Sequence, residues 1–232
     1  MSNLSKLLLP LALAAAITAC SKPADQAAAP SETAAPAEAA AAAPAAPEAA
    51  AIQVAAGTYK LDPTHTDVLV QWNHLGFSNP TAHFGNADGT LVYDAADVTK
   101  STVEVTLPLS GLNSFTAKFD EHLRSADFFD AAKFPSATFK STKVEAAGTN
   151  KLAVTGDLTV KGVTKPVVLD VTVNGAGEHP MAKTPAVGFD ATTTLKRSDF
   201  GMGAYVPNVG DDIKVRITTE ALVPKAEEAK AE

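Results

Sequence analysis

The chain has only one cysteine, Cys20, and it lacks any cluster of basic residues. A single cysteine excludes a disulfide within the chain, even if the protein is exported. The formal net charge is −7, from 19 Lys and Arg against 26 Asp and Glu. Because an acidic chain without a basic patch does not attract phosphates, nucleic acid is a poor candidate partner.

Recognisable catalytic motifs are also absent. The five histidines form neither an HExxH nor an HxH pattern, so we expect no metal site. An enzyme that uses a metal at His65, His74 or His83 is the weakest alternative; His74 follows an apolar strand face, which predicts a partly buried imidazole. The chain has no GxSxG motif and no glycine-rich phosphate loop. We therefore expect a protein that is not an enzyme and needs no cofactor.

The first twenty residues have the pattern of an export signal. Lys6 supplies a weak positive charge, and the apolar run from Leu7 to Thr18 is about a dozen residues long, which is too short to span a bilayer. Residues 17–19, one aliphatic and two small residues, directly precede Cys20, and this pattern resembles a bacterial lipobox. We expect a signal peptide over residues 1–19 and a lipidated Cys20. A plain secretory signal with an incidental cysteine is the alternative.

Residues 20–56 predict a tether between that anchor and a folded domain. From residue 21 to 56, nineteen residues are alanine and five are proline, so no alanine run reaches a self-sustaining helical length. We expect the spacer to hold residues 57–224, one domain with a single core, off the membrane. Residues 225–232 predict a charged tail. The signal peptide and Cys20 together predict a lipid-anchored periplasmic protein, and Ser21 favours its sorting to the outer membrane.

Apolar and polar residues alternate through most of the domain. Val103, Val105 and Leu107 alternate with polar residues, and the same period of two recurs at 68–72, 167–173 and 213–217. Such segments are typical of antiparallel strands with one buried face. Glycine-containing segments at 87–89, 148–150 and 174–177 fit hairpin turns. We expect eight to ten strands, and the pattern leaves open whether they form a sandwich or a barrel.

One segment, Ala117 to Phe129, breaks this alternation and predicts a short helical excursion. Phe119, Leu123 and Ala126 share a helical face, so we expect the segment to pack over one mouth of the sheet or against its wall. Charged residues here and near residue 197 have simple structural interpretations. We expect Arg197 and Asp199 to pair with one another or with charges of the helical segment; binding of a lipid head group is the alternative.

Three sequence blocks resemble the YceI-like family of periplasmic lipid-binding β-barrels. Residues 115–139 contain six of the ten phenylalanines, and 122–142 read HLRSADFFDAAKFPSATFKST. Residues 156–166 read GDLTVKGVTKP, and residues 197–202 read RSDFGM. The resemblance implies an all-β fold: an extended antiparallel lipocalin-like barrel of about eight strands with an elongated apolar cavity. Members of the family are often dimers, so a homodimer is a further expectation.

The resemblance also implies a long-chain isoprenoid lipid, of the polyprenyl or quinone type, as the partner that the barrel carries or sequesters. The alternative is a structural or stress-related envelope lipoprotein whose barrel is packed and holds no cargo. Ten residues are the predicted ligand contacts, each with ordinary core packing as its alternative role: Val70, Trp72, Phe77, Phe84, Leu107, Phe119, Phe139, Leu158, Leu169 and Phe189.

Overall fold

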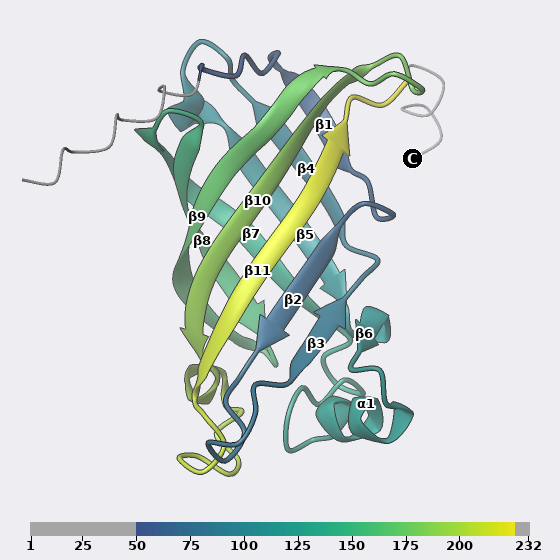
Figure 1. The fold of residues 1–232 in the computed structure, drawn as a ribbon, viewed down its shortest axis with the longest axis vertical. Helices are drawn as coiled ribbons and strands as arrows, with labels where there is room; N and C mark the ends of the chain where they lie inside the picture. Colours follow the sequence, from purple (N-terminus) through teal and green to yellow (C-terminus); the bar gives the residue numbers. More distant parts are fainter. Residues whose placement is uncertain (1–49, 226–232) are drawn as a thin grey trace, which may run out of the picture. The chain divides into compact units, whose positions relative to one another are not determined.

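The computed structural model describes residues 50–225, so the expected signal peptide, most of the tether and the end of the charged tail lie outside the described residues. The described chain forms eleven strands and one α-helix (Figure 1). In chain order they are β1 (Gly57–Leu61), β2 (Asp67–Gln71), β3 (Thr81–Phe84), β4 (Asp88–Tyr93), β5 (Thr102–Pro108), β6 (Leu112–Asn113), α1 (Ala117–Arg124), β7 (Ser136–Gly148), β8 (Lys151–Val160), β9 (Val163–Glu178), β10 (Pro185–Lys196) and β11 (Asp212–Leu222).

Eight of the strands close into an antiparallel barrel. Their order is β1-β4-β5-β7-β8-β9-β10-β11, and β11 pairs with β1 through Ala221 and Leu222 to complete the circle. Closure leaves few unpaired strand edges, which are a liability in open sheets. The barrel that the family resemblance implied is confirmed.

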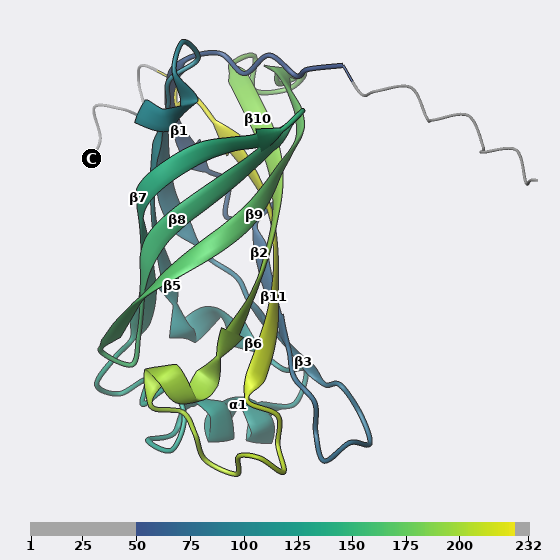
Figure 2. The same cartoon turned by 90° about the vertical axis from the view of Figure 1, so that its left-hand side faces the viewer.

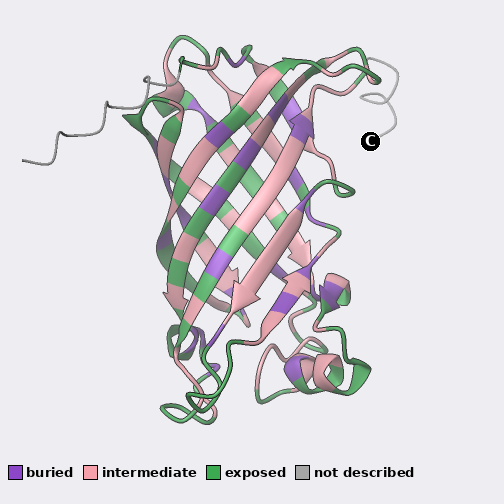
Figure 3. Ribbon diagram, viewed as in Figure 1, coloured by how far each residue is buried: buried purple, intermediate pink, exposed green. Residues whose placement is uncertain are grey.

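The alternation of side chains explains why these segments form the wall. Val103, Val105 and Leu107 of β5 face the interior, whereas Glu104 faces solvent and pairs with Lys140. Figure 3 shows the same alternation of burial along the long strands. The period of two in the sequence therefore arises because alternate residues of each strand face the interior of the barrel.

Three short strands extend the wall at one end of the barrel. There β2 pairs with β11 at Lys214 to Thr218, and β3 and β6 follow in order. The Gly85 amide then donates to the Gly111 carbonyl oxygen at 3.1 Å. A Cβ at Gly111 would lie 2.3 Å from the Gly85 oxygen, so this approach requires glycine at Gly111.

The opposite end of the barrel, hereafter the closed end, is covered by residues 50–56. The Ile52 amide donates to Asn150 Oδ1 at 2.7 Å, and Asn150 Nδ2 donates to the Ala50 carbonyl oxygen at 2.9 Å. Val54 is buried in a cluster with Tyr59 and Phe189. Residues 50–56, which the sequence assigned to the tether, thus pack on the barrel.

The other end, hereafter the open end, is built from α1, the loop of residues 72–80 and the loop of residues 201–211. Figure 2 shows α1 and the second loop at this end. Leu123 of α1 is buried against Trp72 and Phe84. The predicted helical excursion is confirmed, although the helix ends at Arg124 and turns follow it. Among residues 50–225, no helix is long and apolar enough to cross a membrane.

Two of the three predicted turns were wrong. The turn at 148–150 is present, because β7 ends at Gly148 and β8 begins at Lys151. Residues 88 and 89 belong to β4, and the turn before it lies at 85–87. Residues 174–177 lie within β9, where the register with β10 shifts at Asn174, so the glycines mark a β-bulge.

Candidate functional site

The barrel encloses a cavity of about 690 Å³. Its lining extends from Leu61 and Tyr93 near the closed end to Leu75 and Tyr205 at the open end. This volume lies within the range of roughly 300–1,000 Å³ that is usual for small-molecule sites. Most lining side chains are aliphatic or aromatic, and among those of the described chain only Arg197 carries a formal charge at neutral pH. The cavity is thus suited to an apolar guest.

Nine of the ten predicted contact residues line this cavity. They come from β2, β3, β5, α1, β7, β8, β9, β10 and, for Trp72, the loop after β2, so the fold brings distant segments to one space: Val70, Trp72, Phe84, Leu107, Phe119, Phe139, Leu158, Leu169 and Phe189. Their contact with a ligand stays a prediction.

Phe77 is the exception, because it lies outside the cavity and is 90% exposed. Strand β2 ends at Gln71, and the chain then turns through Leu75 and Gly76, both with positive φ. Phe77 also lies an odd number of residues after Trp72, so the period of two along the strand gives no reason to place it inside. His74 is also exposed, not partly buried as predicted, although it lines the cavity at the open end.

A row of aromatic rings leads from the buried Trp72 to the exposed Tyr205. Ring centroids are 5.9 Å apart for Trp72 and Phe119, and 6.0 Å for Phe119 and His122. They are 4.8 Å apart for His122 and Phe128, and 6.3 Å for Phe128 and Tyr205. All five side chains line the cavity. His122, Phe128 and Tyr205 were not predicted as contacts; the density of phenylalanine in residues 115–139 was the only signal for the first two, and Tyr205 had none.

Arg197 is buried and holds the loop of residues 201–211 in place. Its Nε donates to the Gly210 carbonyl oxygen at 2.9 Å, Nη2 to that of Val209 at 2.9 Å, and Nη1 to those of Ala204, at 2.8 Å, and Met202. Burial lowers the pKa of Arg197 and the charge of Asp211 opposes that shift, but a guanidinium stays protonated in proteins.

The predicted partners of Arg197 were therefore wrong. Its donors are taken by backbone carbonyl groups, while Asp120 accepts from the amide and hydroxyl of Ser114. Arg124 likewise donates to the carbonyl oxygens of Leu109 and Leu112. Both arginines fix loops at the open end.

The family model for the YceI-like domain matches residues 59–221. The chain belongs to the YceI-like family. A UPF0312 protein of Pseudomonas putida (strain GB-1) is 42% identical over 168 residues, which cover 70% of this chain and 87% of that protein. A UPF0312 protein of Vibrio cholerae is 42% identical over 149 residues, which cover 63% of this chain and 78% of that protein.

Solved structures share the fold. The Campylobacter jejuni YceI protein has a TM-score of 0.60 and 31% identity, and the match covers 66% of this chain and 90% of that one. Burkholderia cenocepacia BcnA has a TM-score of 0.63 at 24% identity over 69% and 98%. A polyisoprenoid-binding domain from Saccharophagus degradans has a TM-score of 0.56 at 15% identity over 72% and 98%. The last two similarities show the fold alone.

The three YceI-like sequence blocks meet at Lys161 on the open end. Lys161 Nζ donates to the carbonyl oxygens of Ala126, at 2.8 Å, and Gly201, at 3.3 Å, which belong to the other two blocks. Lys161 and Gly162 have positive φ and form the two-residue turn between β8 and β9. The Phe134 ring packs on Gly162, where a Cβ would lie 2.6 Å from it. The three sequence blocks that resemble the family therefore contact one another and stabilise the open end.

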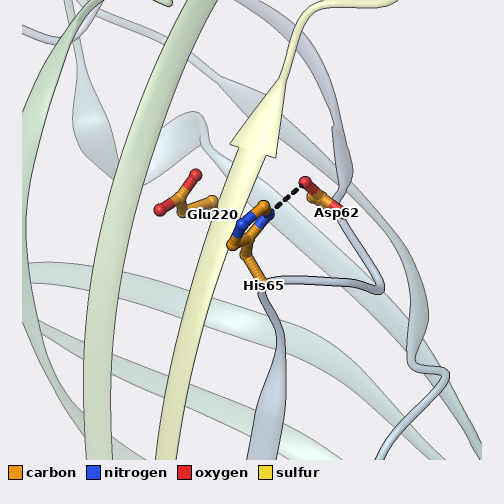
Figure 4. A group of neighbouring side chains, drawn as sticks. All are labelled: Asp62, His65 and Glu220. Carbon is orange, nitrogen blue, oxygen red and sulfur yellow. Dashed lines mark hydrogen bonds and ion pairs between the residues drawn. The ribbon is translucent and has the colours of Figure 1, made fainter.

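Two of the three histidines named as metal candidates, His65 and His83, are paired with separate carboxylates. His83 Nδ1 lies 2.9 Å from Asp67 Oδ2, and His65 Nδ1 lies 2.7 Å from Asp62 Oδ2. Glu220 completes a trio with Asp62 and His65 whose potential ligand atoms lie within 4.8 Å of one another (Figure 4). None of the three lines the cavity, and Asp62 also accepts from the Thr64 amide and hydroxyl. Hydrogen bonds within this turn account for the arrangement of Asp62 and His65.

Proposed function

We propose that this protein binds a long-chain isoprenoid lipid, of the polyprenyl or quinone type, inside the barrel, and that it carries or sequesters the lipid in the periplasm. The observation that carries the proposal is the apolar cavity of about 690 Å³, whose lining includes exposed side chains of the loops at the open end. Membership of the YceI-like family and the shared fold of the Saccharophagus polyisoprenoid-binding domain support the ligand class.

The energetics of such binding depend on hydrocarbon burial. Each buried methylene contributes about 0.8 kcal/mol, so ten carbons contribute roughly 8 kcal/mol before the ligand's ordering is subtracted. Few polar groups are then needed, and the cavity wall offers few. We infer that the protein discriminates weakly between tails of similar girth and that it binds without chemical turnover.

The alternative role, an envelope lipoprotein with a packed barrel, requires an interior without free space. Native mass spectrometry of protein purified from membrane-containing cells tests both roles. A co-purified mass that matches a prenyl lipid is expected. Preparations that are always free of lipid, even after incubation with a detergent-dispersed polyprenol, would reject the carrier role.

We also propose that the protein is anchored through lipidated Cys20 and faces the periplasm. The lipobox-like residues before Cys20 support the anchor. The variant Cys20→Ser should move the protein from the membrane fraction to the soluble periplasmic fraction. Membrane association that persists in this variant at high salt would contradict a covalent anchor.

A further inference from the structure

Two loops at the open end expose large apolar side chains side by side. Leu75 is 48% exposed and Phe77 is 90% exposed in the first loop; Tyr205 is 60% and Val206 is 39% exposed in the second. We call these four residues the apolar rim. The loops are joined, because the Leu75 amide donates to the Asn208 carbonyl oxygen at 3.1 Å and His74 forms a β-bridge with Val209. They therefore form one continuous surface.

Within the two loops only Asp211, the last residue of the second loop, carries a formal charge, in a chain that is 19% charged. Residues 68–87 and residues 200–210 contain no Asp, Glu, Lys or Arg. A surface that binds a charged protein partner normally carries complementary charges. An uncharged rim with aromatic side chains matches instead the boundary between lipid head groups and hydrocarbon, where such side chains are enriched.

The backbone of the rim is strained in a way that a simple turn would avoid. Leu75 has a φ of 56° and Tyr205 a φ of 66°, in the left-handed region that bulky residues seldom adopt. Glycine or asparagine would occupy these positions at lower cost. The chain keeps large apolar side chains there, and the hydrogen bonds from Arg197 hold the second loop rigid. Backbone of this kind is found at functional sites, and Lys161 and Lys183 adopt it in the connections between strands.

The rim is also continuous with the cavity. Leu75 and Tyr205 belong to both surfaces, and the aromatic row begins at Tyr205. A hydrocarbon tail can therefore pass from the rim to the interior along apolar groups. We propose that the apolar rim inserts into the surface of a lipid bilayer and that lipid enters the cavity there. This inference deepens the proposed function, on which it rests, by naming the surface from which the lipid is taken.

Vesicle flotation tests the inference without the covalent anchor. The chain from Cys20 onwards, carrying Cys20→Ser, is mixed with phosphatidylcholine vesicles at low and at high salt. Because the rim is uncharged, we expect binding that does not weaken at high salt. The variant Phe77→Ser should bind at least about tenfold more weakly, since the transfer of a phenylalanine side chain from water has at least this effect.

Met181→Ser provides the matched control. Met181 is 86% exposed in the turn between β9 and β10, at the closed end, so its loss should leave vesicle binding unchanged. The double variant Leu75→Asn with Phe77→Ser should bind still more weakly, while Asn suits the left-handed backbone and keeps the fold. Wild-type protein that does not float, or a Phe77→Ser variant that floats equally well, overturns the inference. So does Phe77-dependent dimerisation without vesicle binding, because a second copy would then cover the rim.

Loading from detergent separates this inference from the proposed function. Phe77 does not line the cavity, so Phe77→Ser should take up a detergent-dispersed polyprenol as well as the wild type does, as measured by native mass spectrometry. Normal loading of the wild-type protein without vesicle binding rejects the rim and leaves the carrier role standing. Vesicle binding without any loading supports the rim and rejects the carrier role.

Discussion

Leu169 and Val168 are neighbours on β9, yet one faces the cavity and the other faces solvent. Leu169 lines the cavity and lies opposite Val154 of β8, whereas Val168 is 49% exposed. Because neighbouring residues of a strand face opposite sides, substitutions at these two positions can test whether the cavity holds lipid.

The variant Leu169→Trp should fill part of the cavity and lower the amount of co-purified lipid at least severalfold. The control Val168→Trp adds the same group to the outer face and should change the free energy of unfolding by less than about 0.5 kcal/mol. Native mass spectrometry measures the lipid, and urea unfolding measures stability. Equal lipid content in the two variants would mean that Leu169 does not contact the ligand.

Asp62 and His65 predict a pH dependence of stability. Burial would raise the pKa of Asp62, but hydrogen bonds from Thr64 and His65 outweigh it and lower that pKa from 3.8 to about 2. The hydrogen bond to Asp62, with the charges of Asp62 and Glu220, raises the pKa of His65 above 6.5. Asp62 thus stabilises the fold above pH 3.8 and loses this effect as pH falls through about 2. His65 stabilises it below pH 6.5 and loses the effect as pH rises through its raised pKa.

The variant Asp62→Asn removes the contribution of Asp62 and the part of the His65 contribution that Asp62 provides, while the charge of Glu220 remains. The difference in melting temperature between wild type and variant should therefore be largest between pH 3.8 and pH 6.5 and should shrink on either side. Differential scanning calorimetry over a pH series measures it. A difference that stays constant across the whole pH series, from below about 2 to above the raised pKa of His65, would show that the charges of the pair do not interact.

At the scale of elements, the contact between Gly85 and Gly111 continues the pairing of β3 with β6. A Cβ on Gly111 would meet the Gly85 oxygen at 2.3 Å and its carbonyl carbon at 2.9 Å, both of which are backbone atoms that cannot rotate away. Gly111→Ala should therefore destabilise the protein by about 1–3 kcal/mol in urea unfolding.

The matched control for that change is Gly85→Ala. A Cβ at Gly85 has nothing within 4 Å and φ is not in the left-handed region, so the effect should be small. If both variants unfold at the same urea concentration, the two glycines do not hold the wall together.

The strands could be predicted from the sequence because their periodicity is local. The inward faces at 68–72, 103–107, 167–173 and 213–217 are confirmed. Loop geometry was less accessible, since glycine marks both turns and bulges, which is why 174–177 was mistaken for a turn. Phe77 follows an apolar strand in sequence, but the turn that directs it outward depends on backbone angles at Leu75 and Gly76.

Contacts between distant segments were not predictable from local pattern. The aromatic row joins Trp72, α1 and Tyr205, which are far apart along the chain. The partners of Arg197 are carbonyl groups of a loop whose path is set by the whole fold. Barrel closure itself came from the family resemblance, because alternation alone fits a sandwich equally well.

At the scale of the whole molecule, the distance between the proposed anchor and the open end limits what the protein can reach. The 29 residues between Cys20 and Ala50 could extend to roughly 100 Å. Strand β9, with 16 residues, indicates a barrel of roughly 40 Å along its axis, once strand tilt is considered. The tether is thus long enough for the open end to meet the anchoring membrane.

Deletion of residues 27–46 tests this reach, because it leaves nine residues, or roughly 30 Å, between Cys20 and Ala50. The lipidated variant should take up less polyprenol from the vesicle in which the protein is anchored, as measured by native mass spectrometry after detergent extraction. An insertion of equal length made of glycine and serine should restore uptake. Undiminished uptake by the shortened protein would mean that lipid reaches the cavity by another path.

The entry of the chain at the closed end has one more consequence. Ala50 is held at the closed end by Asn150. If the proposed anchor were joined to the barrel by a short tether, the open end would therefore point away from the anchoring membrane. A longer tether would let the open end turn back to the same membrane that holds the proposed anchor. Relatives with the same barrel and tethers of different length would then divide into those that store lipid locally and those that pass it between membranes.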